Sequence, residues 1–200
     1  MLIYSSDFYD RAILSLHTGT SIAQIQSLVI NPYNLTIIAF KLAGSRLDNP
    51  NDSFLLLSSV REISPIGFIV NSSDEIVASE DVIKLKEILD LNFKLPGIKV
   101  ITKKGVKLGK VSDFVVNLAS MSIEQLIIER PIFKAFLDPE LTIHRSKIID
   151  ISNDLITIED EKERPKVKQM VGDKVEPVGD FINPFRKEPK PEVNSSSQAE

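Results

Sequence analysis

Hydrophobic and polar residues alternate over short stretches of the chain, and turn-forming residues separate these stretches. The pattern predicts strands at residues 13–17, 22–30, 36–42, 54–57, 62–63 and 67–70. The triplet Leu28-Val29-Ile30 breaks the alternation, so we expect a β-bulge or burial on both faces there. Several short strands at close spacing favour a small β-barrel or sandwich.

One segment has helical spacing instead. Ser79 is a suitable N-cap, and the apolar residues that follow it recur three and four positions apart. Proline and glycine at 96–97 end the segment. We therefore predict a helix over about residues 79–91 that connects the two halves of the chain. Its apolar face carries Val82, Leu85, Ile88 and Leu89.

The second half of the chain repeats the pattern of the first. Residues 14–42 align with residues 100–128 at an offset of 86, without a gap and with matching apolar positions. Residues 60–64 match residues 148–152 at an offset of 88. The sequence therefore predicts one β unit over 1–90, including the helix, and a second over 91–162. The identical pairs are Gly19/Gly105, Val29/Val115, Asn31/Asn117 and Ile37/Ile123.

Composition narrows the class of protein. The chain has 200 residues, 42% of them hydrophobic, a net charge of −4 and no cysteine. It therefore has no disulfides or thiolate sites, and bulk charge does not favour nucleic-acid binding. We find no secretory signal and no transmembrane segment, and we expect a cytoplasmic protein. Residues 163–200 hold five of the eleven prolines and end in a polar run, so we expect a flexible, disordered tail.

Residues 105–117, which read Gly-Val-Lys-Leu-Gly-Lys-Val-Ser-Asp-Phe-Val-Val-Asn, resemble the opening of a PRC-barrel domain. The first half resembles it more loosely, with Ala23, Gln24 and Ser27 in place of Gly109, Lys110 and Asp113. The resemblance implies a mainly β fold of two tandem small PRC-like barrels. It implies no shared catalytic residues, and it implies docking roles like those of reaction-centre and ribosome-maturation barrels.

Three sets of residues could carry chemistry. Gly105, Gly109 and Lys110 resemble a phosphate-binding loop, but the spacing is one residue short and the context is strand to strand, so we predict a hairpin turn. His17 and His144 are predicted surface or strand-edge residues. The acidic run at 159–163 alternates with basic residues and is predicted to be solvated.

Two apolar clusters lie where loops should be polar, and they supply the candidate partner-binding residues. They could instead pack on the barrels. The tail cluster is flanked by polar residues, as in peptides that anchor in a groove. The candidates are Phe133, Phe136 and Leu137 in the second half, and Phe181 and Phe185 in the tail.

The sequence therefore predicts a non-enzymatic adaptor that presents its barrel surfaces to a protein partner. We assign it no catalytic, cofactor-binding or metal-binding residue and no cofactor. Two alternatives stay open. One is an accessory factor in ribosome maturation or RNA processing, and the other is a regulatory module that binds a small ligand.

Overall fold

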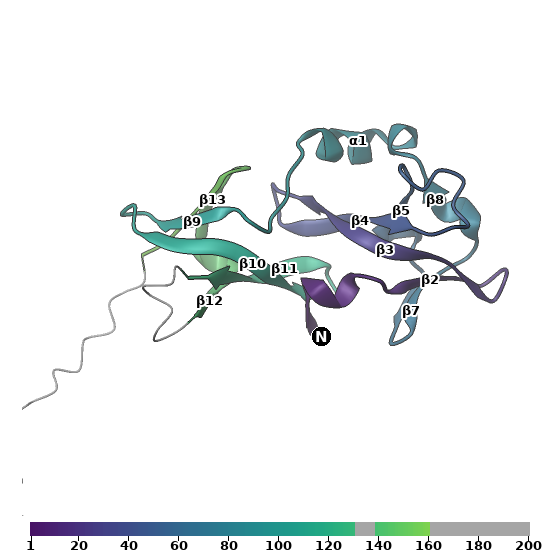
Figure 1. The fold of residues 1–200 in the computed structure, drawn as a ribbon, viewed down its shortest axis with the longest axis horizontal. Coiled ribbons are helices and arrows are strands. Elements are labelled where there is room, and N and C mark those ends of the chain that lie inside the picture. Colours follow the sequence, from purple (N-terminus) through teal and green to yellow (C-terminus); the bar gives the residue numbers. More distant parts are fainter. Residues whose placement is uncertain (131–138, 161–200) are drawn as a thin grey trace, which may run out of the picture. The chain divides into compact units, whose positions relative to one another are not determined.

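The computed structural model describes residues 1–130 and 139–160. Residues 1–161 form one compact unit, and residues 162–200 are a separate unit that lies outside the described residues. The described fold is mainly β, as the sequence predicts. Figure 1 shows the helix α1 (Ile83–Asp90) above three strands of the first half, β3 (Thr20–Asn31), β4 (Thr36–Ala43) and β5 (Phe54–Leu56).

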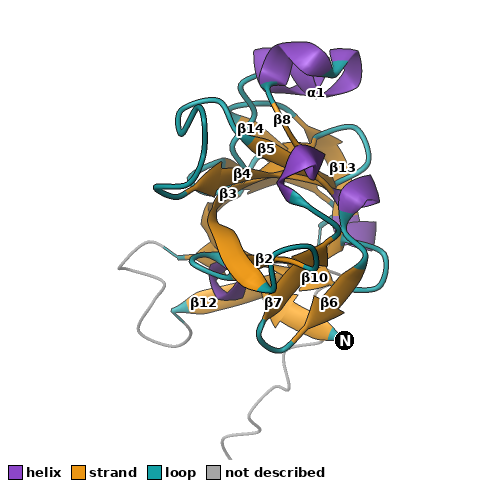
Figure 2. Cartoon of the chain, turned by 90° about the vertical axis from the view of Figure 1, so that its right-hand side faces the viewer, coloured by secondary structure: helices purple, strands orange, loops and turns teal. Residues whose placement is uncertain are grey.

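Apart from the N-terminal strand β1 (Leu2–Tyr4), the first half contains seven strands in the order β6-β7-β2-β3-β4-β5-β8. The strands β2 and β7 are parallel, and the other neighbours are antiparallel. Figure 2 shows these strands curving around a common interior, with α1 outside them. Their bounds are β2 Ala12–Ser15, β3 Thr20–Asn31, β4 Thr36–Ala43, β5 Phe54–Leu56, β6 Glu62–Ser64, β7 Gly67–Val70 and β8 Ile76–Val77.

The second half has the corresponding order β13-β14-β9-β10-β11-β12. Here β9 and β14 are parallel, as β2 and β7 are. In the described residues no strand ladder joins β6 and β13, the two ends of the sheet path. Backbone hydrogen bonds therefore do not close the sheet into a barrel. The bounds are β9 Lys99–Thr102, β10 Lys107–Asn117, β11 Ser122–Glu129, β12 Glu140–His144, β13 Ile148–Ile151 and β14 Leu155–Ile158.

The two halves match in detail, at the offsets found in the sequence. The bulges between β3 and β4 fall at Ile25/Ser27 and Val29/Ile30, and those between β10 and β11 fall 86 residues later. Val29 packs in one hydrophobic cluster and Ile30 in another. The predicted disruption at 28–30 is therefore both a bulge and a burial on two faces.

Equivalent residues join the halves at their centre. Leu35 and Met121 both have a left-handed backbone, with φ of 52° and 50°. Ile37 N donates to Met121 O at 2.9 Å, and Ile123 N donates to Leu35 O at 2.8 Å. Because these two bonds interchange when the halves are exchanged, the contact is locally two-fold symmetric.

The N-terminal segment also crosses between the halves. The strand β1 (Leu2–Tyr4) precedes the first half in sequence but pairs with β10 of the second. The 3₁₀ helix η1 (Ser5–Phe8) follows it, and Phe8 packs on Phe40 and Phe68 with ring centroids 6.0 Å away in each case. One continuous hydrophobic cluster accordingly includes residues of both halves.

The helix begins later than predicted. Ser79 opens a 3₁₀ turn, η4 (Ser79–Asp81), and the α-helix begins at Ile83 after Val82, whose φ is −129°. Asp52 accepts a hydrogen bond from the Ser79 backbone N–H at 3.2 Å, and Asp81 accepts one from Ala78 N at 2.9 Å. The side chains of Asp52 and Asp81, rather than that of Ser79, therefore satisfy the free N–H groups at this turn.

Candidate functional site

All five predicted partner-binding residues lie outside the described residues. Phe133, Phe136 and Leu137 fall in 131–138, and Phe181 and Phe185 fall in 161–200. Their role as partner-binding residues stays a prediction. The described residues supply the other candidate surfaces.

The glycine-rich segment of the second half is a hairpin, as predicted. Gly105 N donates to Thr102 O at 2.8 Å, which closes the turn between β9 and β10. Gly109 lies inside β10, where a Cβ atom would stand 1.9 Å from Glu129 O of β11. The glycine therefore allows two backbones to approach closely, and no phosphate-binding loop forms.

The two histidines and Glu159 of the acidic run lie at exposed positions. His17 is exposed in the turn after β2. His144 ends β12, where its Nδ1 accepts a hydrogen bond from Ser146 N at 3.2 Å. Glu159 lies 3.4 Å from Lys147 Nζ in a salt bridge. Within residues 1–130 and 139–160, no three His, Asp or Glu side chains gather as metal ligands.

A polar cluster connects η1 to the long bulged strand β10. Ser5 is buried, and its hydroxyl donates a hydrogen bond to Asp113 Oδ1. Burial raises the pKa of the nearby Tyr9 phenol, the negative charge of Asp113 raises it further, and a hydrogen bond with Ser5 opposes both. Tyr9 therefore stays protonated, and able to donate a hydrogen bond, to higher pH than an ordinary tyrosine.

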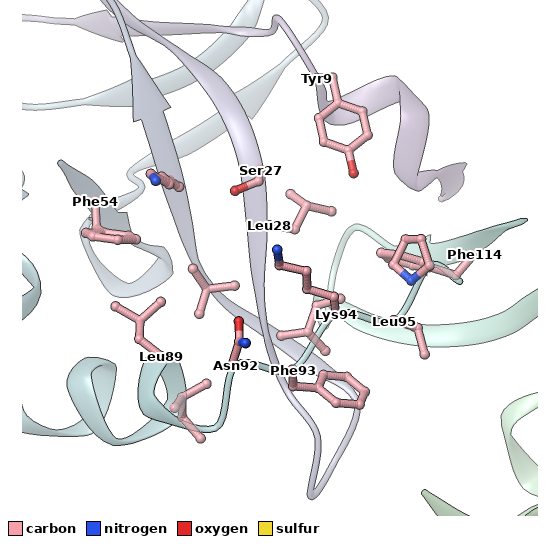
Figure 3. Close-up of a pocket in the computed structure, with 15 residues that line it drawn as sticks. Tyr9, Ser27, Leu28, Phe54, Leu89, Asn92, Phe93, Lys94, Leu95 and Phe114 are labelled. Atoms are coloured by element: carbon pink, nitrogen blue, oxygen red, sulfur yellow. The ribbon is translucent and has the colours of Figure 1, made fainter. Parts of the chain in front are cut away.

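A hollow in the described residues lies beside β3, and we call it the α1 pocket. It has a volume of about 500 Å³. Figure 3 shows Ser27, Tyr9, Asn92 and Lys94 around it, with the Lys94 side chain extending toward β3. The lining residues are Tyr9, Ser27, Leu28, Val29, Ile30, Lys41, Phe54, Ile88, Leu89, Asn92, Phe93, Lys94, Leu95, Pro96 and Phe114.

A second hollow of about 370 Å³ lies where the β3–β4 turn meets β13, and we call it the Tyr33 groove. Tyr33 is 80% exposed and Ile149 is 50% exposed. Arg145 Nη2 donates to Asn34 O at 3.1 Å across the groove. The lining residues are Pro32, Tyr33, Asn34, Leu35, Arg145, Ile148, Ile149, Asp150 and Ile151.

Sequence reasoning missed both hollows. Each is lined by residues from both halves, and those of the α1 pocket run from Tyr9 to Phe114. A usable signal existed for the Tyr33 groove, because a tyrosine in an Asn-Pro-Tyr-Asn turn should face solvent. No comparable signal marked the α1 pocket, because Lys41 and Lys94 read as ordinary surface lysines.

A comparison with known protein families gives a match for part of the chain. Residues 93–165 match the family model described as PRC-barrel domain. No curated protein matches the chain. In the described residues, no helix has the length and apolar character needed to cross a membrane.

Proposed function

From the premise that residues 93–165 are a PRC-barrel domain, we propose that this chain is a non-catalytic docking module that binds a protein partner in the cytosol. We propose further that the first half is a second, diverged copy of the same domain. The matching strand order, bulges and left-handed turns of the two halves support this second point.

The observation that carries the docking role is the Tyr33 groove. It combines an exposed tyrosine, an exposed isoleucine and an arginine, and tyrosine and arginine are enriched at the energetic centres of protein interfaces. It is bordered by β13, the end strand of the sheet path. An exposed edge strand offers backbone hydrogen-bonding groups to a partner in addition to side-chain contacts.

The polar side chains that could serve catalysis have structural contacts instead. Asp113 accepts the Ser5 hydroxyl, His144 accepts from Ser146, and Glu159 pairs with Lys147. Phe133, Phe136, Leu137, Phe181 and Phe185 remain proposed contributors to the same binding role.

The test is affinity purification of the full chain, followed by binding measurements with the purified partner. Tyr33→Ala and Ile149→Ala should each weaken binding by about tenfold, the loss typical of a central interface residue. Because both side chains are exposed, the melting temperature should stay nearly constant. Ile66→Ala, which removes a 73%-exposed isoleucine outside the groove, is the matched control.

The affinities of these variants show whether the partner binds the Tyr33 groove or another surface. If the Ile66 variant loses as much affinity as the Tyr33 variant, the groove is not the docking site. If Phe136→Ala abolishes binding while both groove variants bind normally, the partner uses the 131–138 segment and the groove proposal is wrong.

A further inference from the structure

The α1 pocket has the make-up of a small-molecule site. Its volume of about 500 Å³ lies in the range of about 300–1,000 Å³ found for ligand pockets. Ten of its fifteen lining residues are apolar, and the polar ones are Tyr9, Ser27, Lys41, Asn92 and Lys94. No aspartate or glutamate lines it, so its charged groups are two lysines.

Four of the five polar side chains of the pocket have no partner in the described part of the chain, and each of the four can donate a hydrogen bond. Ser27, Lys41, Asn92 and Lys94 form no side-chain hydrogen bond or salt bridge with any residue in the described part of the chain. Lys41 is half-buried on β4, where it pairs with Ser27 in the strand register. Lys94 and Asn92 are exposed, so the half-buried Lys41 carries the less screened charge of the pocket, and a positive charge beside apolar walls attracts an anion.

In the second half, the position equivalent to the α1 pocket is covered by a segment of the chain itself, the 3₁₀ helix η1. Asp113 on β10 corresponds to Ser27 on β3, and Ser5 from η1 donates a hydrogen bond to Asp113. The segment 92–96 of the second half is the counterpart of η1, because Gly97 N donates to Val111 O as Asp10 N donates to Ile25 O. This segment lines the pocket beside Ser27, as η1 lies beside Asp113.

The equivalent position on the first half is an open pocket, and its charged side chains are basic rather than acidic. Asn92 stands five residues before Gly97, as Ser5 stands five before Asp10, but the Asn92 side chain forms no hydrogen bond with Ser27. At the position of Ile127 the first half has Lys41. A carboxylate bound by the chain's own hydroxyl is thus replaced by a hydroxyl and lysines that lack an acceptor.

We infer that the α1 pocket binds an amphipathic organic anion, namely a carboxylate carried on an aliphatic or aromatic body. Lys41 and Lys94 pair with the carboxylate, and Ser27 donates a hydrogen bond to it. The hydrocarbon body packs against apolar residues such as Phe54 and Leu89.

The borders of the pocket favour a carboxylate over a phosphate. Phosphate sites commonly use backbone N–H groups at a helix N-terminus. Here the C-terminal residues of α1, Ile88 and Leu89, border the pocket, and the negative end of the helix dipole disfavours a doubly charged anion more than a singly charged one. A singly charged carboxylate fits this balance better.

The test compares three ligands of equal chain length against the full chain: decanoate, decanol and decyltrimethylammonium. The two ions are kept below their critical micelle concentrations and decanol below its solubility limit. Calorimetry should show decanoate binding about tenfold more tightly than decanol, as expected for hydrogen bonds to a charged group. The cation should bind more weakly than decanol. Amide NMR shifts should change at residues 27–30 and 92–96.

Charge-removing variants locate the site. Lys94→Gln and Lys41→Gln should each weaken decanoate binding by up to about fivefold, the upper end for an exposed ion pair, and leave decanol binding unchanged. Lys84→Gln is the control, because Lys84 is exposed on α1 and does not line the pocket. All three variants leave the Tyr33 groove intact, so failure here is distinct from failure of the docking proposal.

Three results would overturn the inference. Decanol could bind as tightly as decanoate, which would remove the role of charge. The Lys84 variant could lose as much affinity as the Lys94 variant, which would place the anion elsewhere. Finally, decanoate could cause shift changes outside the lining residues only.

Discussion

The two halves differ at single equivalent residues whose side chains change the local packing and hydrogen bonding. Gly109 allows β10 and β11 to approach, since a Cβ atom there would lie 1.9 Å from Glu129 O. The first half has Ala23 at the corresponding sequence position, and this explains part of its looser resemblance to the family opening. The equivalent residues Asp113 and Ser27 also differ. Asp113 accepts a hydrogen bond from Ser5, whereas Ser27 lines the open α1 pocket.

The close approach at Gly109 gives a first prediction. Gly109→Ala should lower the free energy of unfolding by about 3 kcal/mol, because the added methyl group meets a backbone oxygen that cannot move away easily. Gly19→Ala is the control: nothing lies within 4 Å of its Cβ position, so only its φ of 65° costs about 1 kcal/mol. Urea unfolding measures both, and equal losses would contradict the close-contact explanation.

The Ser5–Asp113 bond gives a second prediction. Asp113→Ala leaves the Ser5 hydroxyl buried without its acceptor, and stability should fall by about 2 kcal/mol. Removing Ser5 as well should add little, because the hydroxyl that lost its acceptor is then absent, and the loss of the hydrogen bond from Phe114 N to Asp113 is common to both variants. A double-mutant cycle by urea unfolding measures this coupling, and strictly additive losses would show that the bond contributes nothing.

Tyr9 gives a prediction about pH. Its pKa is raised in the folded state, above the ordinary value of 10.0, mainly by burial. A raised pKa means that the folded state resists ionisation, so the stability it contributes is complete below pH 10 and is lost as pH rises through the folded pKa. Stability should therefore fall above pH 10 in the native chain and fall less in Tyr9→Phe. Identical pH profiles for the two chains would rule out a role for Tyr9.

At the scale of elements, the sequence predicted the strands well because most are amphipathic and short. The expected strands at 36–42 and 67–70 agree with β4 and β7 to within one residue. The helix start was wrong because Asp52, which lies 27 residues before Ser79 in sequence, binds the Ser79 N–H. The α1 pocket was missed for a similar reason, since its lining depends on which distant segments meet.

The packing of α1 can be tested by a neighbouring pair of residues. Leu85 is 1% exposed in the cluster that joins α1 to β3 and β5, whereas Ile83 is 76% exposed. Leu85→Ala should lower the free energy of unfolding by about 3 kcal/mol, as expected for a large buried aliphatic side chain. Ile83→Ala should change it by less than about 0.5 kcal/mol. Similar effects of the two variants would mean that α1 does not pack as described.

At the scale of the whole molecule, the sequence indicated two units, and the structure shows residues 1–161 as one compact unit. The reason is specific. The strand β1 pairs with β10, η1 places Phe8 in the core of the first half and Ser5 on Asp113 of the second, and residues 35–37 exchange backbone bonds with residues 121–123. Pattern repeats predict two similar units, but they do not predict which unit a terminal segment joins.

This interlocking predicts cooperative unfolding. Since neither half can open without breaking β1–β10 pairing and the central backbone bonds, urea should produce one transition, with the same midpoint for signals from both halves. Native-state hydrogen exchange measures this directly: slowly exchanging amides of β4 and β11 should share one opening free energy. Phe68→Ala, which damages only the first-half core, should lower both by an equal amount of about 3 kcal/mol. If only the β4 amides exchange faster, the halves unfold independently and the shared interface contributes little to stability.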